Sequence, residues 1–147
     1  IKTKRLNIYK FNNRDWQMLA SKNENNLSYK QSLDYILHQK EDKTIVLGFD
    51  SSSRRYKEND ISWIWDIDFE SLNDESVKNI VLIGKFAYDM YLRMKYANID
   101  ENKLLVVEDI NNLSEILKAK TKGKIFSMVC FDKEIELKRI IKEENND

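Results

Sequence analysis

Two tryptophans and three aspartates fall within the ten residues Asp60–Phe69, an unusual concentration of side-chain chemistry. Large aromatic side chains can fix a backbone so that one carboxylate, Asp60 or Asp66, is held at the edge of a site, where it could orient a histidine. The alternative is a strand or turn whose Trp63 and Trp65 pack on the core while the aspartates stay solvated. Spacing alone leaves Asp60 and Asp66 equally eligible.

A basic cluster lies just before this segment, in the polar stretch 51–59 that predicts a loop. Arg54 and Arg55 could contact a phosphate or a carboxylate, because the loop follows a predicted buried strand and ligands of parallel sheets bind beyond the carboxyl ends of strands. The alternative is a solvated cluster with no ligand.

The sequence has one histidine and one cysteine. His38 stands near the end of a predicted helix, where a surface or structural role is expected, and Cys130 lies in an apolar run typical of a buried small hydrophobe. We therefore predict no metal site and no nucleophile–base pair within this chain. The glycines form no phosphate-binding pattern, which argues against a dinucleotide or Walker-type site.

Apolar periodicity predicts strands that alternate with helices. Strands are expected at Leu6–Phe11, Trp16–Ala20, Thr44–Phe49, Asn79–Gly84, Leu104–Val107 and Ile125–Phe131, and helices at Leu27–His38, Phe86–Tyr96, Asn111–Lys120 and Glu134–Glu143. The turn-like Asn12-Asn13 favours a hairpin for the first two strands. This order predicts a three-layer Rossmann-like α/β domain with a mainly parallel sheet. Within it, Asp89 and Arg93 are expected to form a surface pair one helical turn apart.

The bulk composition narrows the class of protein. A length of 147 residues suits one domain, and a formal net charge of zero gives no global attraction for nucleic acid. The longest apolar run is far shorter than the roughly 20 residues that span a bilayer, so the chain is not expected to cross a membrane. A single cysteine fits a reducing cytoplasm.

The stretch Asp60–Glu70 resembles the signature of the C-terminal domain of MurT-type Mur ligases. Further pieces in the same order are Arg5, Lys22-Asn23, Gly84, Ala87–Met90 and Leu92–Ala97. The resemblance covers nearly the whole chain. It implies that residues 1–147 form a single domain of the Mur ligase C-terminal type, with the ligase's central ATP-binding domain outside these residues.

Members of this family pair with a GatD-type glutaminase to form lipid II isoglutaminyl synthase, which amidates the D-glutamate of the peptidoglycan stem peptide using ATP, Mg²⁺ and glutamine-derived ammonia. The resemblance implies that Asp60 completes a Cys-His-Asp triad with the glutaminase, and we expect it to be partly exposed beside an apolar patch that the partner covers. Substrate or partner contacts are expected from Trp63, Trp65, Asp66, Arg54 and Arg55. The isolated domain should be inactive. The alternative is a diverged, non-catalytic Rossmann-like binding module.

Overall fold

A computed structural model describes residues 6–20, 26–48, 62–129 and 131–146. The strands are β1 (Leu6–Phe11), β2 (Arg14–Ala20), β3 (Lys43–Gly48), β4 (Val77–Ile83), β5 (Leu104–Val107) and β6 (Lys124–Val129). The α-helices are α1 (Asn26–His38), α2 (Ala87–Tyr96), α3 (Leu113–Lys120) and α4 (Phe131–Asn145), and 3-10 helices include η2 (Ser62–Asp66), η3 (Phe69–Leu72) and η5 (Ile110–Asn112).

The six strands form one sheet in the order β1-β2-β6-β3-β4-β5. β1 and β2 pair antiparallel, as the predicted hairpin requires, and every other neighbouring pair is parallel. Asn12 and Asn13 link β1 to β2 with φ of 50° and 63°. Positive φ at both turn residues matches the twist of a two-residue hairpin, and asparagine tolerates that conformation well.

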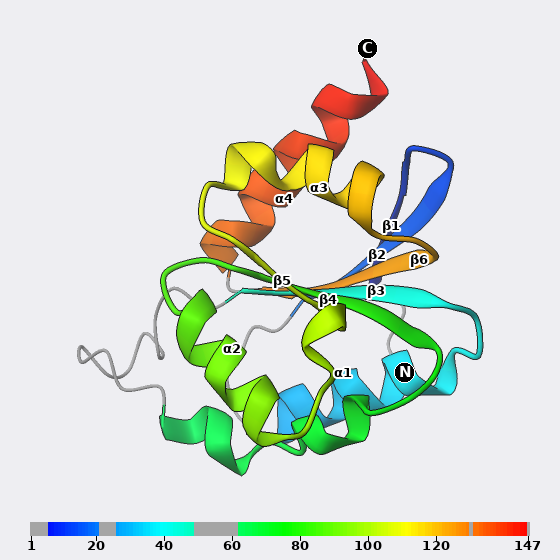
Figure 1. Cartoon of the computed structure of the whole chain (residues 1–147). Coiled ribbons are helices and arrows are strands. Elements are labelled where there is room, and N and C mark those ends of the chain that lie inside the picture. The colour runs from blue at the N-terminus through cyan, green and yellow to red at the C-terminus, as the bar shows by residue number, and fades with distance from the viewer. Residues whose placement is uncertain (1–5, 21–25, 49–61, 130, 147) are drawn as a thin grey trace.

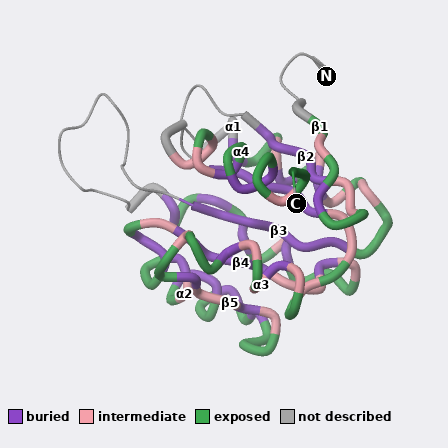
Figure 2. The backbone as a smooth tube through the Cα atoms, turned by 90° about the horizontal axis from the view of Figure 1, so that it is seen from above, coloured by how far each residue is buried: buried purple, intermediate pink, exposed green. Residues whose placement is uncertain are grey.

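Helices cover both faces of the sheet, which confirms the three-layer prediction (Figure 1). α1 and α2 lie on one face together with η2 and η3, and α3 and α4 lie on the other. β3 is buried along its whole length, as Figure 2 shows. Because both of its faces are covered, its sequence is a nearly continuous apolar run rather than an alternating one.

The last strand and the last helix divide differently from the prediction. β6 ends at Val129 and α4 begins at Phe131, whereas the apolar run through Phe131 predicted a longer strand and a helix starting at Glu134. Phe131 continues the apolar run of β6, and the charged Asp132 and Lys133 that follow it resemble a loop, so the sequence pattern placed the end of the strand and the start of the helix too late.

The structure tests the prediction for His38 but not the one for Cys130. His38 is exposed at the end of α1, with Nδ1 2.7 Å from the carbonyl oxygen of Asp34, which agrees with the expected surface role. Cys130 lies outside the described residues.

Within the described ranges, no helix combines the length and the apolar character needed to cross a bilayer.

Gly123 gives a direct test of the turn between α3 and β6. Its φ is +86°, and an added Cβ would lie 2.2 Å from the carbonyl oxygen of Asp42. Because both the backbone angle and the close contact penalise a side chain, Gly123→Ala is expected to lower the free energy of unfolding by about 2–3 kcal/mol. Urea denaturation measures the change, and Lys122→Ala, at the exposed neighbouring position, should stay within about 0.5 kcal/mol of wild type. An unchanged Gly123→Ala protein would contradict this turn geometry.

Candidate functional site

The predicted site residues divide into described and undescribed groups. Arg54, Arg55 and Asp60 lie outside the described residues. Trp63 belongs to the backbone of η2, but its side chain is likewise outside the description. Trp65 and Asp66 are described, and both side chains are exposed. The site must therefore be built from the segment that follows Asp60 and from the helix against which this segment packs.

The aromatic segment is neither a strand nor a single turn, because it forms the two 3-10 helices η2 and η3. Its buried side chains are aliphatic or phenyl groups, namely Ile64, Ile67, Phe69 and Leu72. Trp65 keeps 43% of its surface exposed, so the interpretation that placed this tryptophan in the core is wrong. The aliphatic residues supply the core anchor, which leaves the Trp65 ring at the surface.

Arg93 of α2 holds this segment. Its Nε donates to the carbonyl oxygen of Ile64 at 3.1 Å, and its Nη2 donates to the carbonyl oxygen of Ile67 at 2.6 Å and to Oε1 of Glu70 at 2.8 Å. The Arg93 side chain is only 3% exposed. The predicted surface pair with Asp89 is therefore wrong. The guanidinium is buried, and it pairs with a residue far away in sequence.

Two aromatic rings pack around the same guanidinium. Its central carbon lies 5.4 Å from the ring centroid of Trp65 and 5.4 Å from that of Phe69. Arginine is suited to this place because its planar group can stack on rings while its N–H groups donate in several directions. We name the group of Arg93, Trp65, Phe69 and Glu70 the arginine clamp. It fixes both η2 and η3 on α2.

The signal for the clamp was present in the α2 sequence. Ala87, Met90 and Met94 are the apolar residues that α2 buries, and Arg93 falls among them at helical spacing. A charged residue on the apolar stripe of a helix must find a partner inside the protein, because an unpaired buried charge is costly. Asp89 could not be that partner, because its side chain is exposed to solvent rather than inside the protein.

The clamp gives Glu70 a pH-dependent role. The hydrogen bond from Arg93 holds the pKa of Glu70 below its ordinary value. A carboxylate with a lowered folded-state pKa contributes stability above its unfolded pKa of about 4.3, and this contribution disappears as the pH falls through the folded-state pKa. Glu70→Gln should therefore lower the free energy of unfolding at pH 7 by up to about 1 kcal/mol, since Glu70 is half exposed.

That difference should shrink as the pH falls below the unfolded pKa of about 4.3, which denaturation at several pH values measures. Glu143→Gln is the control, because it removes a pair with Arg139 in which both side chains are exposed, worth less than about 0.5 kcal/mol. A Glu70→Gln penalty that grew as the pH fell would contradict the assignment.

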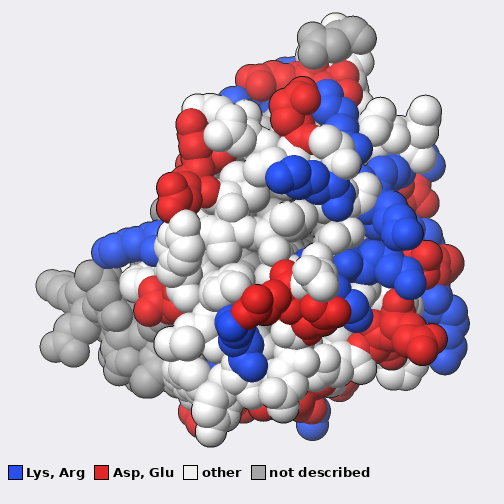
Figure 3. Space-filling view, in the orientation of Figure 1, with Lys and Arg blue, Asp and Glu red and all other residues white. Residues whose placement is uncertain are grey.

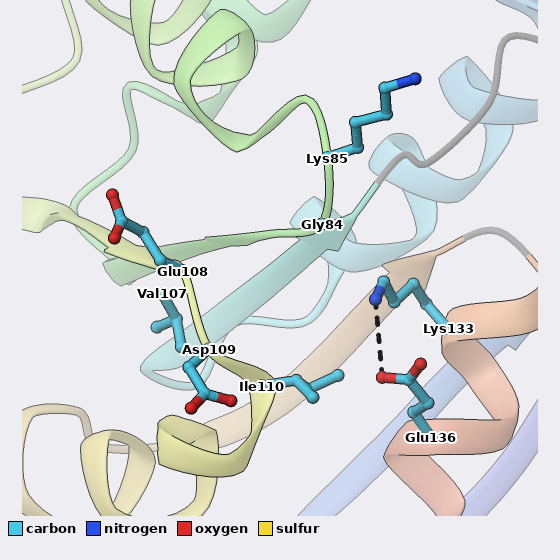
Figure 4. Close-up of a pocket in the computed structure, with 8 residues that line it drawn as sticks. All are labelled: Gly84, Lys85, Val107, Glu108, Asp109, Ile110, Lys133 and Glu136. Atoms are coloured by element: carbon cyan, nitrogen blue, oxygen red, sulfur yellow. Dashed lines mark hydrogen bonds and ion pairs between the residues drawn. The ribbon is translucent and has the colours of Figure 1, made fainter.

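A crevice of about 660 Å³ opens at the carboxyl edge of the sheet (Figure 4). It is lined by Gly84, Lys85, Val107, Glu108, Asp109, Ile110, Lys133 and Glu136. The chain leaves β4 toward α2 on one face of the sheet and leaves β5 toward α3 on the other, so the connections that follow these two paired strands diverge here. Ligands of α/β sheets bind at such divergence points. Of the predicted site residues that the structure describes, neither Trp65 nor Asp66 lines the crevice.

The charged groups of the crevice already have structural partners. Glu108 accepts a hydrogen bond from the Tyr88 hydroxyl, which raises the pKa of Tyr88. Asp109 caps η5 by accepting from the backbone N–H of Asn111 at 2.9 Å. The Nζ atom of Lys133 lies 3.5 Å from Oε2 of Glu136. Figure 4 shows the carboxylates of Glu108 and Asp109 turned away from this ion pair. The crevice thus carries no catalytic pair of its own among the described residues.

The surface around both features has mixed charge. Acidic and basic side chains lie interspersed over the face seen in Figure 3. Among the described residues, no group of three or more His, Cys, Asp or Glu side chains could hold a metal ion. Neither observation supplies a ligand site, so the aromatic segment and its clamp remain the feature that sets this domain apart.

The mostly parallel sheet with helices on both faces is a Rossmann-like α/β domain, consistent with the Mur ligase C-terminal type. The chain belongs to the MurT ligase C-terminal family, whose model matches residues 22–131 and so includes the whole aromatic segment.

Two curated relatives are similar to part of the chain. Both are described as "Lipid II isoglutaminyl synthase (glutamine-hydrolyzing) subunit MurT", one from Staphylococcus aureus strain COL and one from strain N315. Each is 39% identical over 51 residues, which is 35% of this chain and 11% of the relative. The aligned segment therefore spans about a tenth of the length of these relatives.

Proposed function

We propose that this chain is the C-terminal domain of the Mur ligase-like subunit of a lipid II isoglutaminyl synthase. In this proposal residues 1–147 act as one domain of a cytoplasmic enzyme. The complete enzyme amidates the D-glutamate of the peptidoglycan stem peptide of lipid II, using ATP and ammonia released from glutamine. The partner is a GatD-type glutaminase subunit, toward which this domain presents an aspartate.

The observation that carries the proposal is the clamped segment. The family match includes it, and Arg93 fixes η2, which begins two residues after Asp60. A segment held by a buried guanidinium is a rigid support, and a functional side chain next to rigid structure loses less freedom when it acts. Asp60 is the position that matches the family's triad aspartate, and Asp66 at the end of η2 is the alternative within the same segment.

In the proposed hydrolysis of glutamine, the aspartate orients the partner's histidine and does not itself react. The partner's cysteine attacks the carboxamide of glutamine as a thiolate, and the partner's histidine takes the thiol proton. A carboxylate that accepts a hydrogen bond from the far ring nitrogen of that histidine fixes its tautomer and stabilises the imidazolium. The imidazolium gives its proton to the leaving ammonia, water hydrolyses the remaining glutamyl thioester to glutamate, and the ligase subunit adds the ammonia to an activated carboxylate. Arg54 and Arg55 are proposed contacts for the anionic substrate.

ATP and Mg²⁺ belong to the complete ligase in this proposal. The described residues offer no cluster of carboxylates for a metal ion, and the sequence has no glycine-rich phosphate loop. We therefore assign the nucleotide to other parts of the enzyme and derive no step through it from this chain. The isolated domain is accordingly expected to be inactive.

The deciding experiment reconstitutes the natural protein that contains this chain with its glutaminase and compares Asp60→Ala with Asp66→Ala. Glutamine hydrolysis that falls only in Asp60→Ala supports the shared triad. Equal activity in both variants and in wild type would instead favour a diverged binding module that keeps the fold without the catalytic role.

A further inference from the structure

α2 carries an apolar stripe on its outer face. Tyr88, Leu92 and Tyr96 are 60%, 61% and 72% exposed, although exposed helix faces are normally polar. They are spaced four residues apart, so they lie along one side of the helix. The ring of Trp65 in η2 meets the ring of Tyr96 edge to face, with centroids 5.1 Å apart. The stripe therefore continues from α2 onto η2.

The clamp explains why Trp65 belongs to this surface. Arg93 stacks on the inner side of the Trp65 ring and binds the backbone around it, while 43% of the tryptophan stays open to solvent. A large aromatic side chain held rigid at the surface loses little entropy when a partner covers it, which is the property of binding hot spots. At the other end of the stripe, Tyr88 is fixed by its hydrogen bond to Glu108.

We propose that Trp65, Tyr88, Leu92 and Tyr96 form the surface on which the glutaminase subunit docks, an inference that rests on the proposed function. Short distances along the chain favour this partner. Ser62 follows Asp60 by two peptide steps, so their Cα atoms lie at most about 7 Å apart, and the three 3-10 helical steps from Ser62 to Trp65 add about 6 Å. A partner that buries about 800 Å² on this domain covers a disc of roughly 16 Å radius.

A glutaminase whose histidine reaches Asp60 therefore covers Trp65 as well, and the stripe is the apolar surface continuous with it. The same conclusion holds if Asp66 is the triad residue, since it follows Trp65 directly. Docking on the stripe thus depends only on the aspartate segment being the point of contact, and either aspartate gives the same surface.

The test measures the dissociation constant between the natural protein containing this chain and its glutaminase. Leu92→Glu and Tyr96→Glu should each weaken binding at least about 10-fold, because a buried unpaired charge replaces apolar contact. Ile135→Glu and Ile8→Glu are matched controls, since these side chains are 56% and 62% exposed on α4 and β1. Both controls should bind within about twofold of wild type.

Wild-type affinity in both Leu92→Glu and Tyr96→Glu would overturn the docking surface. A second outcome against it is a wild-type dimer that dissociates in Leu92→Glu while glutaminase affinity stays unchanged, which would make the stripe a self-association surface. Asp60→Ala separates this proposal from the catalytic one. Full glutaminase activity in Asp60→Ala together with weak binding of Leu92→Glu would sink the shared triad and leave the docking surface standing.

Discussion

Glutamine hydrolysis by the reconstituted complex is expected to fall by about 100-fold or more when Asp60 is replaced by alanine, since loss of a triad carboxylate can cost up to about 10⁴-fold. Without the carboxylate, the partner's histidine is free to adopt the tautomer that cannot take the thiol proton, and the imidazolium loses its counter-charge. The loss should appear in kcat, because alanine at this position removes no contact with glutamine itself. Steady-state release of glutamate measures it.

Asp66→Ala is the comparison for this prediction, because Asp66 is an exposed carboxylate of the same segment. It should lose far less activity than Asp60→Ala, since the proposal gives the triad role to Asp60. A large loss in Asp66→Ala with normal activity in Asp60→Ala would transfer the triad role to Asp66. Asp60→Asn adds a finer test, since an amide keeps the shape of the side chain but removes the charge, and it should be impaired nearly as much as alanine.

Replacing Arg93 by leucine is expected to lower the free energy of unfolding by about 3 kcal/mol, within the range for breaking a buried, hydrogen-bonded charge. The leucine cannot donate to the carbonyl oxygens of Ile64 and Ile67, which Arg93 now satisfies. η2 and η3 should loosen from α2 at the same time. Trp65 fluorescence should then shift toward that of a fully solvated indole before the global transition, and urea denaturation gives the free energy.

Arg139→Leu is the control for this prediction. Arg139 pairs with Glu143 at 3.0 Å, but both side chains are about half exposed or more, so its loss should cost less than about 0.5 kcal/mol. Arg93→Lys should fall between the two, since a lysine keeps the charge and loses the forked geometry. Equal stability of Arg93→Leu and Arg139→Leu would contradict the clamp.

Local pattern was enough to predict most of the fold. The buried strands β3, β4 and β5 were predicted to within two residues because an apolar run bounded by polar residues has few other interpretations. The Asn12-Asn13 turn similarly determined the hairpin. The order of the strands was not predictable. β6 lies between β2 and β3 in the sheet, and no local pattern in residues 124–129 indicates which distant strands it pairs with.

The candidate site was harder to predict for the same reason. The interpretation of Arg93 as a partner of Asp89 relied on the helix alone, while its actual partner Glu70 is 23 residues away. The placement of Trp65 failed because hydrophobic bulk predicts burial only on average. In this segment smaller side chains fill the core, and the arginine keeps the indole at the surface. The positions of Asp60, Arg54 and Arg55 remain predictions from sequence.

The place of β6 in the sheet has a consequence for synthesis of the chain. Among the described strands of this domain, β6 is the last to leave the ribosome, yet it pairs with both β2 and β3. The N-terminal hairpin therefore has no sheet neighbour until residue 129 has emerged, and a nascent chain that stops earlier holds two separate half-sheets with open edges. We expect this domain to complete its fold late in translation, so that chains truncated before β6 aggregate or are degraded rather than persist as a smaller stable unit.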